Sequence, residues 1–254
     1  MASARYAKIT RKDGGTLSES DIIKNAFALH NIIDAVCTGD WAIPNTIQNA
    51  SGYAGQWSKI ELLKNIDFNA VEFVSFAYGT NDYASATPLV NADDPYDINT
   101  VTGALRYSVK TLLAKYPHLK IVVSLPIYRF FTDSSNNITS DGDTKDFGGG
   151  TLARYCEAIA KTATSMHIPY VDCYNGGGIN EFNRLYYFDI TDGTHPNKNG
   201  QDMIGHCIAS WLKNPGVIQS YIGASGVPTE TLNQIEAQLD EIIETQNSYI
   251  GGNE

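Results

Sequence analysis

The chain of 254 residues has few cysteines, no long hydrophobic run and fewer basic than acidic residues. Its four cysteines, Cys37, Cys156, Cys173 and Cys207, are scattered and form no Cys-x-x-Cys pair. This pattern excludes a disulfide scaffold and a zinc-finger framework, so we expect buried thiols and no metal site. No apolar stretch approaches the ~20 residues of a membrane-spanning helix, and no apolar segment follows the basic residues near the start. We therefore expect no membrane partner and no secretory signal peptide, which is compatible with the cytoplasm but does not fix the location.

Basic residues are in the minority, with 18 Lys and Arg against 28 Asp and Glu and a net charge of −10. Because phosphate contacts require clustered Lys and Arg, we expect no nucleic-acid partner. The acids are unevenly placed, and those after Lys213 have no base among them: Glu230, Glu236, Asp240, Glu241, Glu244 and Glu254. This change in charge predicts a domain boundary near residue 214.

What the sequence does contain is an alternation of helical and strand patterns. The helical patterns cover residues 18–37, 56–64, 100–116, 151–163 and a last segment opened by Asn197, and the strand patterns cover residues 70–78, 120–125 and 170–174. Strand–helix units of this length favour right-handed crossovers, so they predict an α/β fold whose parallel sheet has helices on both faces. The run at 70–78 is apolar at successive positions, which predicts a fully buried, central strand.

The last part of the chain has a different pattern. Leu232, Ile235, Leu239 and Ile242 are spaced as in a heptad repeat, with acids between them. The pattern predicts an amphipathic helix that either joins copies of the chain into a homo-oligomer or docks on its own domain. The expected organisation is therefore a domain over 1–213, irregular in its first 17 residues or so, and a linker with an acidic helix over 214–254.

Two polar clusters carry residues suited to chemistry, and both are expected at carboxyl ends of strands, where open parallel sheets bind ligands. The first, Gly79-Thr80-Asn81-Asp82, follows the 70–78 strand directly, and the second, Asp192-Gly193-Thr194-His195-Pro196-Asn197, occupies a turn-rich loop before the last helix. The spacing of Asp192 and His195 lets the carboxylate accept from Nδ1 while Nε2 faces a cleft, which is what acyl transfer requires of a general base. Asn81 can donate to a developing oxyanion, with Gly79 allowing close backbone approach. Each motif alone is common in ordinary turns.

Together, the two motifs in an α/β chain resemble the SGNH (GDSL-like) hydrolase family. Gly79-x-Asn81-Asp82 looks like the third block of that family, and Asp192-x-x-His195, continued by Pro196, Asn197 and Gly200, looks like the fifth. The resemblance covers about residues 40–213. Residues 126–129, 178–184 and 242–252 also look like segments of SGNH domains and structural proteins of phage and prophage tails. This second resemblance adds the virus particle to the cytoplasm as an expected location.

The resemblance implies a flavodoxin-like sheet and hydrolysis of an ester, small or carried on a glycan, by a serine nucleophile without metal or organic cofactor. It implies that His195 is the base, Asp192 its orienting partner and Asn81 an oxyanion donor. On the substrate side we expect Gly79, Tyr128 and Arg129. Four aromatic residues expected on loops near the cleft are equally compatible with stacking on a sugar and with ordinary packing: Tyr128, Phe130, Tyr186 and Tyr187.

The nucleophile of the family is missing from the pattern, because the chain contains no Gly-Asp-Ser. The string Gly39-Asp40-Trp41 has an indole where a hydroxyl is needed. Ser18 is better explained as a helix cap bonded to Asp21. Three strands are found where the resemblance implies about five, so the first strands are expected to be missing, and the nucleophile absent, displaced or supplied by another chain. We therefore predict no serine Oγ within ~3.5 Å of His195 Nε2; the alternative function is an inactive structural or binding module of a phage tail.

Overall fold

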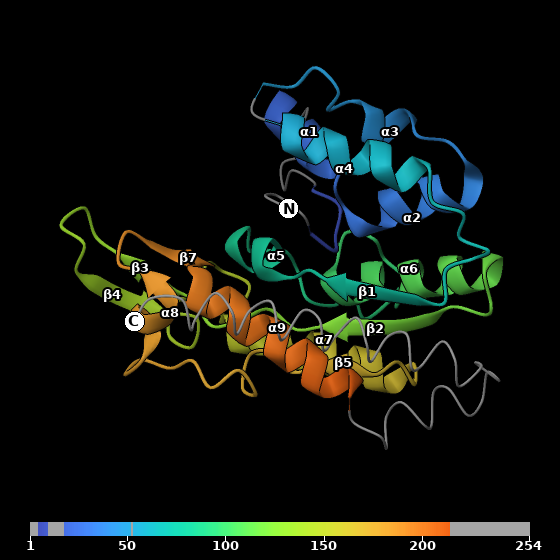
Figure 1. The fold of residues 1–254 in the computed structure, drawn as a ribbon. Helices are drawn as coiled ribbons and strands as arrows, with labels where there is room; N and C mark the ends of the chain where they lie inside the picture. The colour runs from blue at the N-terminus through green and yellow to red at the C-terminus, as the bar shows by residue number, and fades with distance from the viewer. Residues whose placement is uncertain (1–4, 10–17, 52, 214–254) are drawn as a thin grey trace, which may run out of the picture. The chain divides into compact units, whose positions relative to one another are not determined.

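The computed structural model describes residues 5–9, 18–51 and 53–213 (Figure 1). The chain forms two compact units, Met1–Ile204 and Gly205–Glu254. Residues 205–213 are the described part of the second unit, and all but the last of them belong to helix α9 (Lys198–Leu212). The predicted heptad helix and its linker lie outside the described residues, so they remain predictions. Within the described ranges, no helix has the length and hydropathy needed to cross a membrane.

The first unit is built on a parallel sheet of β1 (Phe73–Ala77), β2 (Lys120–Ser124) and β5 (Tyr170–Val171), in the order β1-β2-β5. Helix α6 (Val101–Lys115) connects β1 to β2, and α7 (Leu152–Ser165) precedes β5. The predicted α/β class, with a parallel sheet and helices, is confirmed. The three strand segments and both crossover helices were visible in the sequence because each has a recognisable apolar pattern, mostly apolar in the strands and periodic in the helices.

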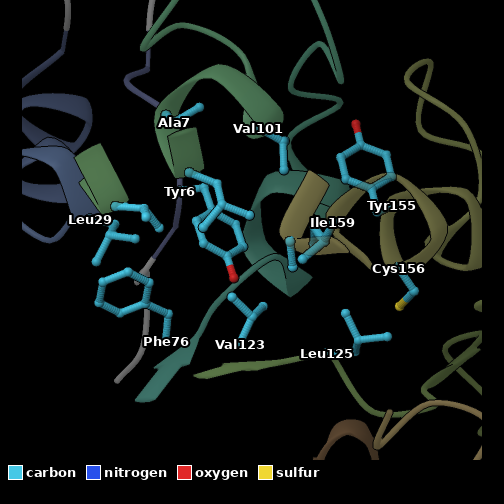
Figure 2. Packing of buried hydrophobic residues seen from close by; sticks show 14 of the residues in the cluster. Tyr6, Ala7, Leu29, Phe76, Val101, Val123, Leu125, Tyr155, Cys156 and Ile159 are labelled. Carbon is cyan, nitrogen blue, oxygen red and sulfur yellow. The ribbon is translucent and has the colours of Figure 1, made fainter. Parts of the chain in front are cut away.

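The main hydrophobic core packs α6, α7 and α2 (Leu29–Thr38) against one face of the sheet. On that face Phe76 of β1 lies in register with Val123 of β2, and both are buried. Tyr6, from the N-terminal segment, is fully buried in the same cluster, and Figure 2 shows its ring among these side chains. The core on this face of the sheet therefore includes a residue of the N-terminal segment, which is remote in sequence from the strands.

The prediction that the 70–78 strand is central and fully buried is wrong. Among the described strands β1 is at the edge and β2 is in the middle. Side chains on one face of β1 are exposed, with Phe73 at 40%, while Phe76 on the other face is 2% exposed. Apolar composition on both faces does not by itself distinguish an edge strand from a central one, because the pairing partner is remote in sequence.

The predicted helix over 18–37 is divided into α1 (Glu19–Asn25) and α2. Ala28 takes an extended conformation, with φ −61° and ψ 136°, and bridges to Arg5 in parallel. The Leu29 N–H donates to the Arg5 carbonyl at 2.9 Å. A tertiary contact with the N-terminal segment therefore interrupts a pattern that looks continuous in sequence. The Ser18–Asp21 cap is present: the Asp21 N–H donates to Ser18 Oγ at 3.2 Å.

Two small antiparallel hairpins were not predicted. β3 (Phe130–Thr132) pairs with β4 (Ile138–Asp141), and β6 (Phe188–Asp189) pairs with β7 (Asp192–Pro196). A separate hydrophobic cluster, made of Tyr128, Phe130, Ile179 and Phe188, lies beneath them. The remaining short helices are α3 (Ala42–Asn45), α4 (Ala54–Lys64), α5 (Thr80–Ala84) and α8 (Arg184–Tyr187).

Candidate active site

The second polar motif forms strand β7 rather than the loop expected from its turn-rich composition. Gly193 allows this, because a Cβ there would lie 2.4 Å from the carbonyl oxygen of Phe130 and 2.8 Å from its ring. A side chain at this position is therefore incompatible with the close approach of β7 to β3. The packing of a glycine against a hydrophobic cluster fixes the strand that carries His195.

Asp192 and His195 are hydrogen bonded as predicted. His195 Nδ1 lies 2.9 Å from Asp192 Oδ2, and the backbone N–H groups of Thr194 and His195 both donate to Asp192 Oδ1 at 3.0 Å. One carboxylate oxygen thus binds the backbone of the turn, and the other binds the imidazole. The His195 side chain is 74% exposed, so the other side of the ring is open to a substrate.

The electrostatics of Asp192 suit an orienting partner. Partial burial raises the pKa of its carboxyl, but the hydrogen bonds from His195 and Thr194 outweigh this effect and hold the pKa below its usual value. Asp192 is therefore ionised at neutral pH and accepts the proton on Nδ1. That leaves Nε2 as the nitrogen able to take a proton from a nucleophile.

The first polar motif lies at the carboxyl end of β1, where it turns into α5. Gly79 has φ +113°, and a Cβ there would lie 2.9 Å from Ile159 Cδ1 and 3.0 Å from Pro126 Cγ. Backbone conformation and packing both require glycine, so the fold explains the glycine at position 79 independently of any substrate. Asn81, the expected oxyanion donor, follows in the first turn of α5 and is half-buried.

Asp82 has a different role from the other motif residues. Its side chain is fully buried, and its oxygens accept the N–H groups of Tyr6 at 2.8 Å and Ala7 at 3.0 Å. Burial raises the pKa of Asp82 to about 6, although those hydrogen bonds and the charge of Arg5 act to lower it. Asp82 therefore anchors the N-terminal segment, a role that the sequence pattern did not reveal.

Arg129 brings the two motifs together. Its NH1 donates to Thr80 Oγ1 at 3.1 Å, and its NH2 donates to Thr194 Oγ1 at 2.7 Å. Thr80 precedes Asn81, and Thr194 precedes His195, so one guanidinium joins the loops that carry the two candidate catalytic groups. Both motifs therefore lie at the same edge of the domain, as the sequence analysis predicted. Arg129 is itself only 7% exposed, which does not fit the substrate contact we expected of it.

The expected role of Tyr128 in substrate binding is also contradicted. The ring is 3% exposed, and the hydroxyl donates to Asp141 Oδ2 at 3.0 Å and accepts from Arg184 NH1 at 3.1 Å. Its neighbour Phe130 is 1% exposed. Both aromatic rings pack in the cluster beneath the hairpins, so neither offers a face for a sugar.

Other apolar side chains near β7 are exposed. Phe182 is 90%, Leu185 is 55% and Tyr186 is 64% exposed. The amides of Asn197 and Asn199 donate to the Tyr186 carbonyl at 3.2 and 3.1 Å, which fixes this segment to the residues that follow His195. The sequence analysis considered Tyr186 but missed Phe182 and Leu185, since exposure cannot be read from an isolated apolar residue. We refer to Phe182, Tyr186 and the aliphatic Leu185 between them as the aromatic platform.

The hydrogen bonds of His195 among the described residues involve Asp192. Within residues 5–9, 18–51 and 53–213, His195 Nε2 has no hydrogen bond to a serine hydroxyl. The hydroxyl oxygens of Ser75 in β1 and Ser124 in β2 lie 3.4 Å from each other. The same residues contain no group of three or more His, Cys, Asp or Glu arranged to hold a metal ion.

Comparison with known proteins places this geometry in context. Residues 16–203 match the profile of the GDSL-like lipase/acylhydrolase family. Among solved structures, a protein from Lactobacillus plantarum is 23% identical, with a TM-score of 0.48 over 59% of this chain and 69% of that one. A possible lipase from Chitinophaga pinensis is 21% identical, with a TM-score of 0.44 over 65% of this chain and 79% of the other. The lipase/acylhydrolase from Enterococcus faecalis is 14% identical, with a TM-score of 0.38 over 62% and 69%. None of the curated proteins compared with the chain matches it.

Proposed function

Since the chain belongs to the GDSL-like lipase/acylhydrolase family, we propose that it is an SGNH-type serine ester hydrolase. The observation that carries the proposal is the 2.9 Å hydrogen bond between His195 Nδ1 and Asp192 Oδ2, on a strand fixed beside the Asn81 motif. An exposed imidazole held by an ionised carboxylate is the arrangement of a general base in acyl transfer. The two residues are close in sequence, but Asn81 is not, so their common location supports a shared purpose.

In the proposed reaction, His195 Nε2 accepts the proton of a serine hydroxyl as that oxygen attacks the ester carbonyl. Asp192 keeps the imidazole in the Nδ1–H tautomer and stabilises the imidazolium that forms. Asn81 donates its side-chain N–H to the oxyanion of the tetrahedral intermediate. His195 then returns the proton to the leaving alcohol, and water hydrolyses the acyl-enzyme by the reverse sequence of transfers.

The proposed substrates are O-acyl esters, including esters carried on carbohydrates. The aromatic platform of Phe182, Leu185 and Tyr186 supports this choice, because exposed rings and alkyl groups beside a base suit the face of a sugar or an acyl chain. Tyr128 has no part in this proposal. The proposed substrate class rests on the exposure of the three platform side chains.

One observation favours a second candidate function, a catalytically inactive structural or binding module such as those of phage tails. His195 Nε2 has no serine partner among the described residues, and without a nucleophile the other groups have nothing to activate. The two candidates differ in one property, which is whether a serine of this protein or of a partner chain becomes acylated.

Hydrolysis of a short p-nitrophenyl ester by the full chain tests the proposal. We expect activity that is lost in His195→Ala and retained in His206→Ala, a matched exposed histidine of the second unit. A fluorophosphonate probe followed by peptide mass spectrometry would then identify the nucleophile, including a serine in a part of the chain not described above. Absence of both hydrolysis and labelling would reject the hydrolase and leave the binding module.

A further inference from the structure

Arg129 is a buried cation with an unusual set of neighbours. The side chain is only 7% exposed, and its Nε is buried without a hydrogen-bond partner among the described residues. The guanidinium carbon lies 4.8 Å from the centre of the Phe131 ring and 5.8 Å from that of Tyr83. Its two terminal nitrogens donate to the hydroxyls of Thr80 and Thr194.

The burial of Arg129 in this environment lowers the stability of the fold. In the described part of the chain no carboxylate forms a salt bridge with Arg129, so only hydroxyls and ring faces replace the water it has lost. Burial lowers the pKa of the guanidinium, which shows the same penalty, while Tyr83 and Asp192 act to raise it. A buried cation without a carboxylate partner costs folding free energy, so its position between two motifs calls for another reason.

The bonds of Arg129 lead directly to both halves of the site. Thr194 accepts from NH2 through its hydroxyl, while its backbone N–H donates to Asp192 Oδ1 at 3.0 Å. The other oxygen of Asp192 holds His195. On the opposite side, Thr80 and the Tyr83 ring both belong to α5, the helix that carries Asn81, so Arg129 contacts that helix at two points.

We propose that Arg129 is a positioning residue that fixes the distance between the acid–base pair and the oxyanion donor by bonding Thr194 on one side and Thr80 on the other. The proposal rests on the proposed hydrolase function. We assign Arg129 no contact with the substrate, because only 7% of the residue is exposed and its terminal nitrogens already donate to Thr80 and Thr194. It acts through the two threonines, whose hydroxyls are the groups that a test must remove.

The first test measures the tautomer of His195 by ¹⁵N spectra of the imidazole, with His195→Gln to assign the signal. The wild-type ring should carry its proton on Nδ1. In Arg129→Met and Thr194→Val the turn that holds Asp192 loosens, so both tautomers should appear, whereas Thr194→Ser keeps the acceptor and should match the wild type. A residue that only filled space would lower stability without changing the tautomer of the folded protein.

The second test measures ester hydrolysis. Arg129→Met and Thr194→Val should lower kcat by about tenfold or more with little change in KM, because misplaced groups weaken the transition state rather than binding. Thr80→Val should lower kcat but leave the His195 tautomer unchanged, since Thr80 lies on the Asn81 side. Arg154→Met, at an exposed arginine, is the matched control and should change neither measurement.

Combining variants sharpens the result. If Arg129 acts on Asp192 through Thr194, the tautomer ratio of Arg129→Met with Thr194→Val should equal that of Thr194→Val alone. A wild-type tautomer in folded Arg129→Met and in Thr194→Val would overturn the proposal. Should Arg129→Met fail to fold, Thr194→Val against Thr194→Ser still decides it. The tautomer measurement needs no turnover, so an inactive wild-type chain would reject the proposed function and leave this inference to be decided separately.

Discussion

Each of the two polar motifs contains an aspartate that could be taken for a catalytic residue, and the structure places them in opposite environments. Asp82 is fully buried, and its carboxylate accepts two backbone N–H groups of the N-terminal segment. Asp192 has a side chain that is 47% exposed and is bonded to the imidazole of His195. Burial raises the pKa of Asp82 to about 6, whereas hydrogen bonds hold that of Asp192 below its usual value despite partial burial.

The comparison shows that one motif residue maintains the fold while the other prepares the chemistry. Asp82 joins segments 75 and 76 residues apart in sequence, so its loss should affect folding. Asp192 joins residues within one short strand, so its loss should affect the imidazole and little else. Substitutions at the two positions should therefore separate stability from activity.

The largest effect is expected from Asp192→Asn on activity. The amide keeps the shape of the side chain but allows the wrong imidazole tautomer, so kcat should fall on the order of a thousandfold. The free energy of unfolding should change by less than about 1 kcal/mol, because the side chain is half exposed. Ester hydrolysis and urea unfolding measure the two quantities. Full activity in this variant would show that Asp192 does not orient His195.

The next effect is on stability, in Asp82→Ala. The variant leaves the N–H groups of Tyr6 and Ala7 buried without an acceptor, which should lower the free energy of unfolding by about 2–5 kcal/mol. Urea unfolding followed by circular dichroism gives the value, with Asp192→Ala as the exposed control. Equal stabilities for the two alanine variants would remove the contrast between the motifs.

The pH dependence of stability should show the same contrast. The folded-state pKa of Asp82, about 6, lies above the usual 3.8, so the folded chain binds this proton more tightly than the unfolded chain. The contribution of Asp82 to the free energy of unfolding is complete below about pH 4. It is lost as the pH rises through about 6, a change of about 3 kcal/mol. Asp192 has the opposite sign: its contribution is present above pH 4 and is lost as the pH falls.

Unfolding of the wild type and of Asp82→Asn from pH 4 to 7 isolates the Asp82 contribution, because the other carboxyl groups titrate in both proteins. The free energy of unfolding of the wild type should exceed that of Asp82→Asn by the largest amount near pH 4, and this difference should shrink toward pH 7. A difference that stays constant over this range would mean that Asp82 keeps one protonation state throughout.

The sequence predicted the features that depend on local spacing. The Asp192–His195 bond follows from residues three apart, and the crossover helices and strand segments follow from apolar periodicity. The start of α6 is equally local, since the Thr100 side chain accepts from the Gly103 N–H at 3.2 Å. In each case neighbours in the chain determine the geometry.

Features that depend on remote partners were missed. Arg129 reaches threonines 49 and 65 residues away, and nothing in its neighbourhood in the sequence signals that it is buried. Likewise, the break before α2 comes from pairing with Arg5, and β7 forms because Gly193 packs on Phe130. The interpretation of Tyr128 as a substrate residue failed for the same reason, because its partners Asp141 and Arg184 are supplied by other segments.

The smallest expected effect concerns the aromatic platform, which extends the contrast from carboxylates to apolar residues. If exposed Tyr186 contacts the substrate, Tyr186→Ala should raise KM for an aromatic or glycan ester about three- to tenfold while changing kcat and stability little, because a lost stacking contact is worth roughly 0.5–1.5 kcal/mol. Val90→Ala, at an apolar residue that is 64% exposed, as Tyr186 is, but belongs to the loop before α6, is the control. Initial rates over a range of substrate concentrations measure the change. An unchanged KM for Tyr186→Ala together with Phe182→Ala would show that the platform serves a contact other than substrate, since two rings removed from one binding surface should give a larger effect than either alone.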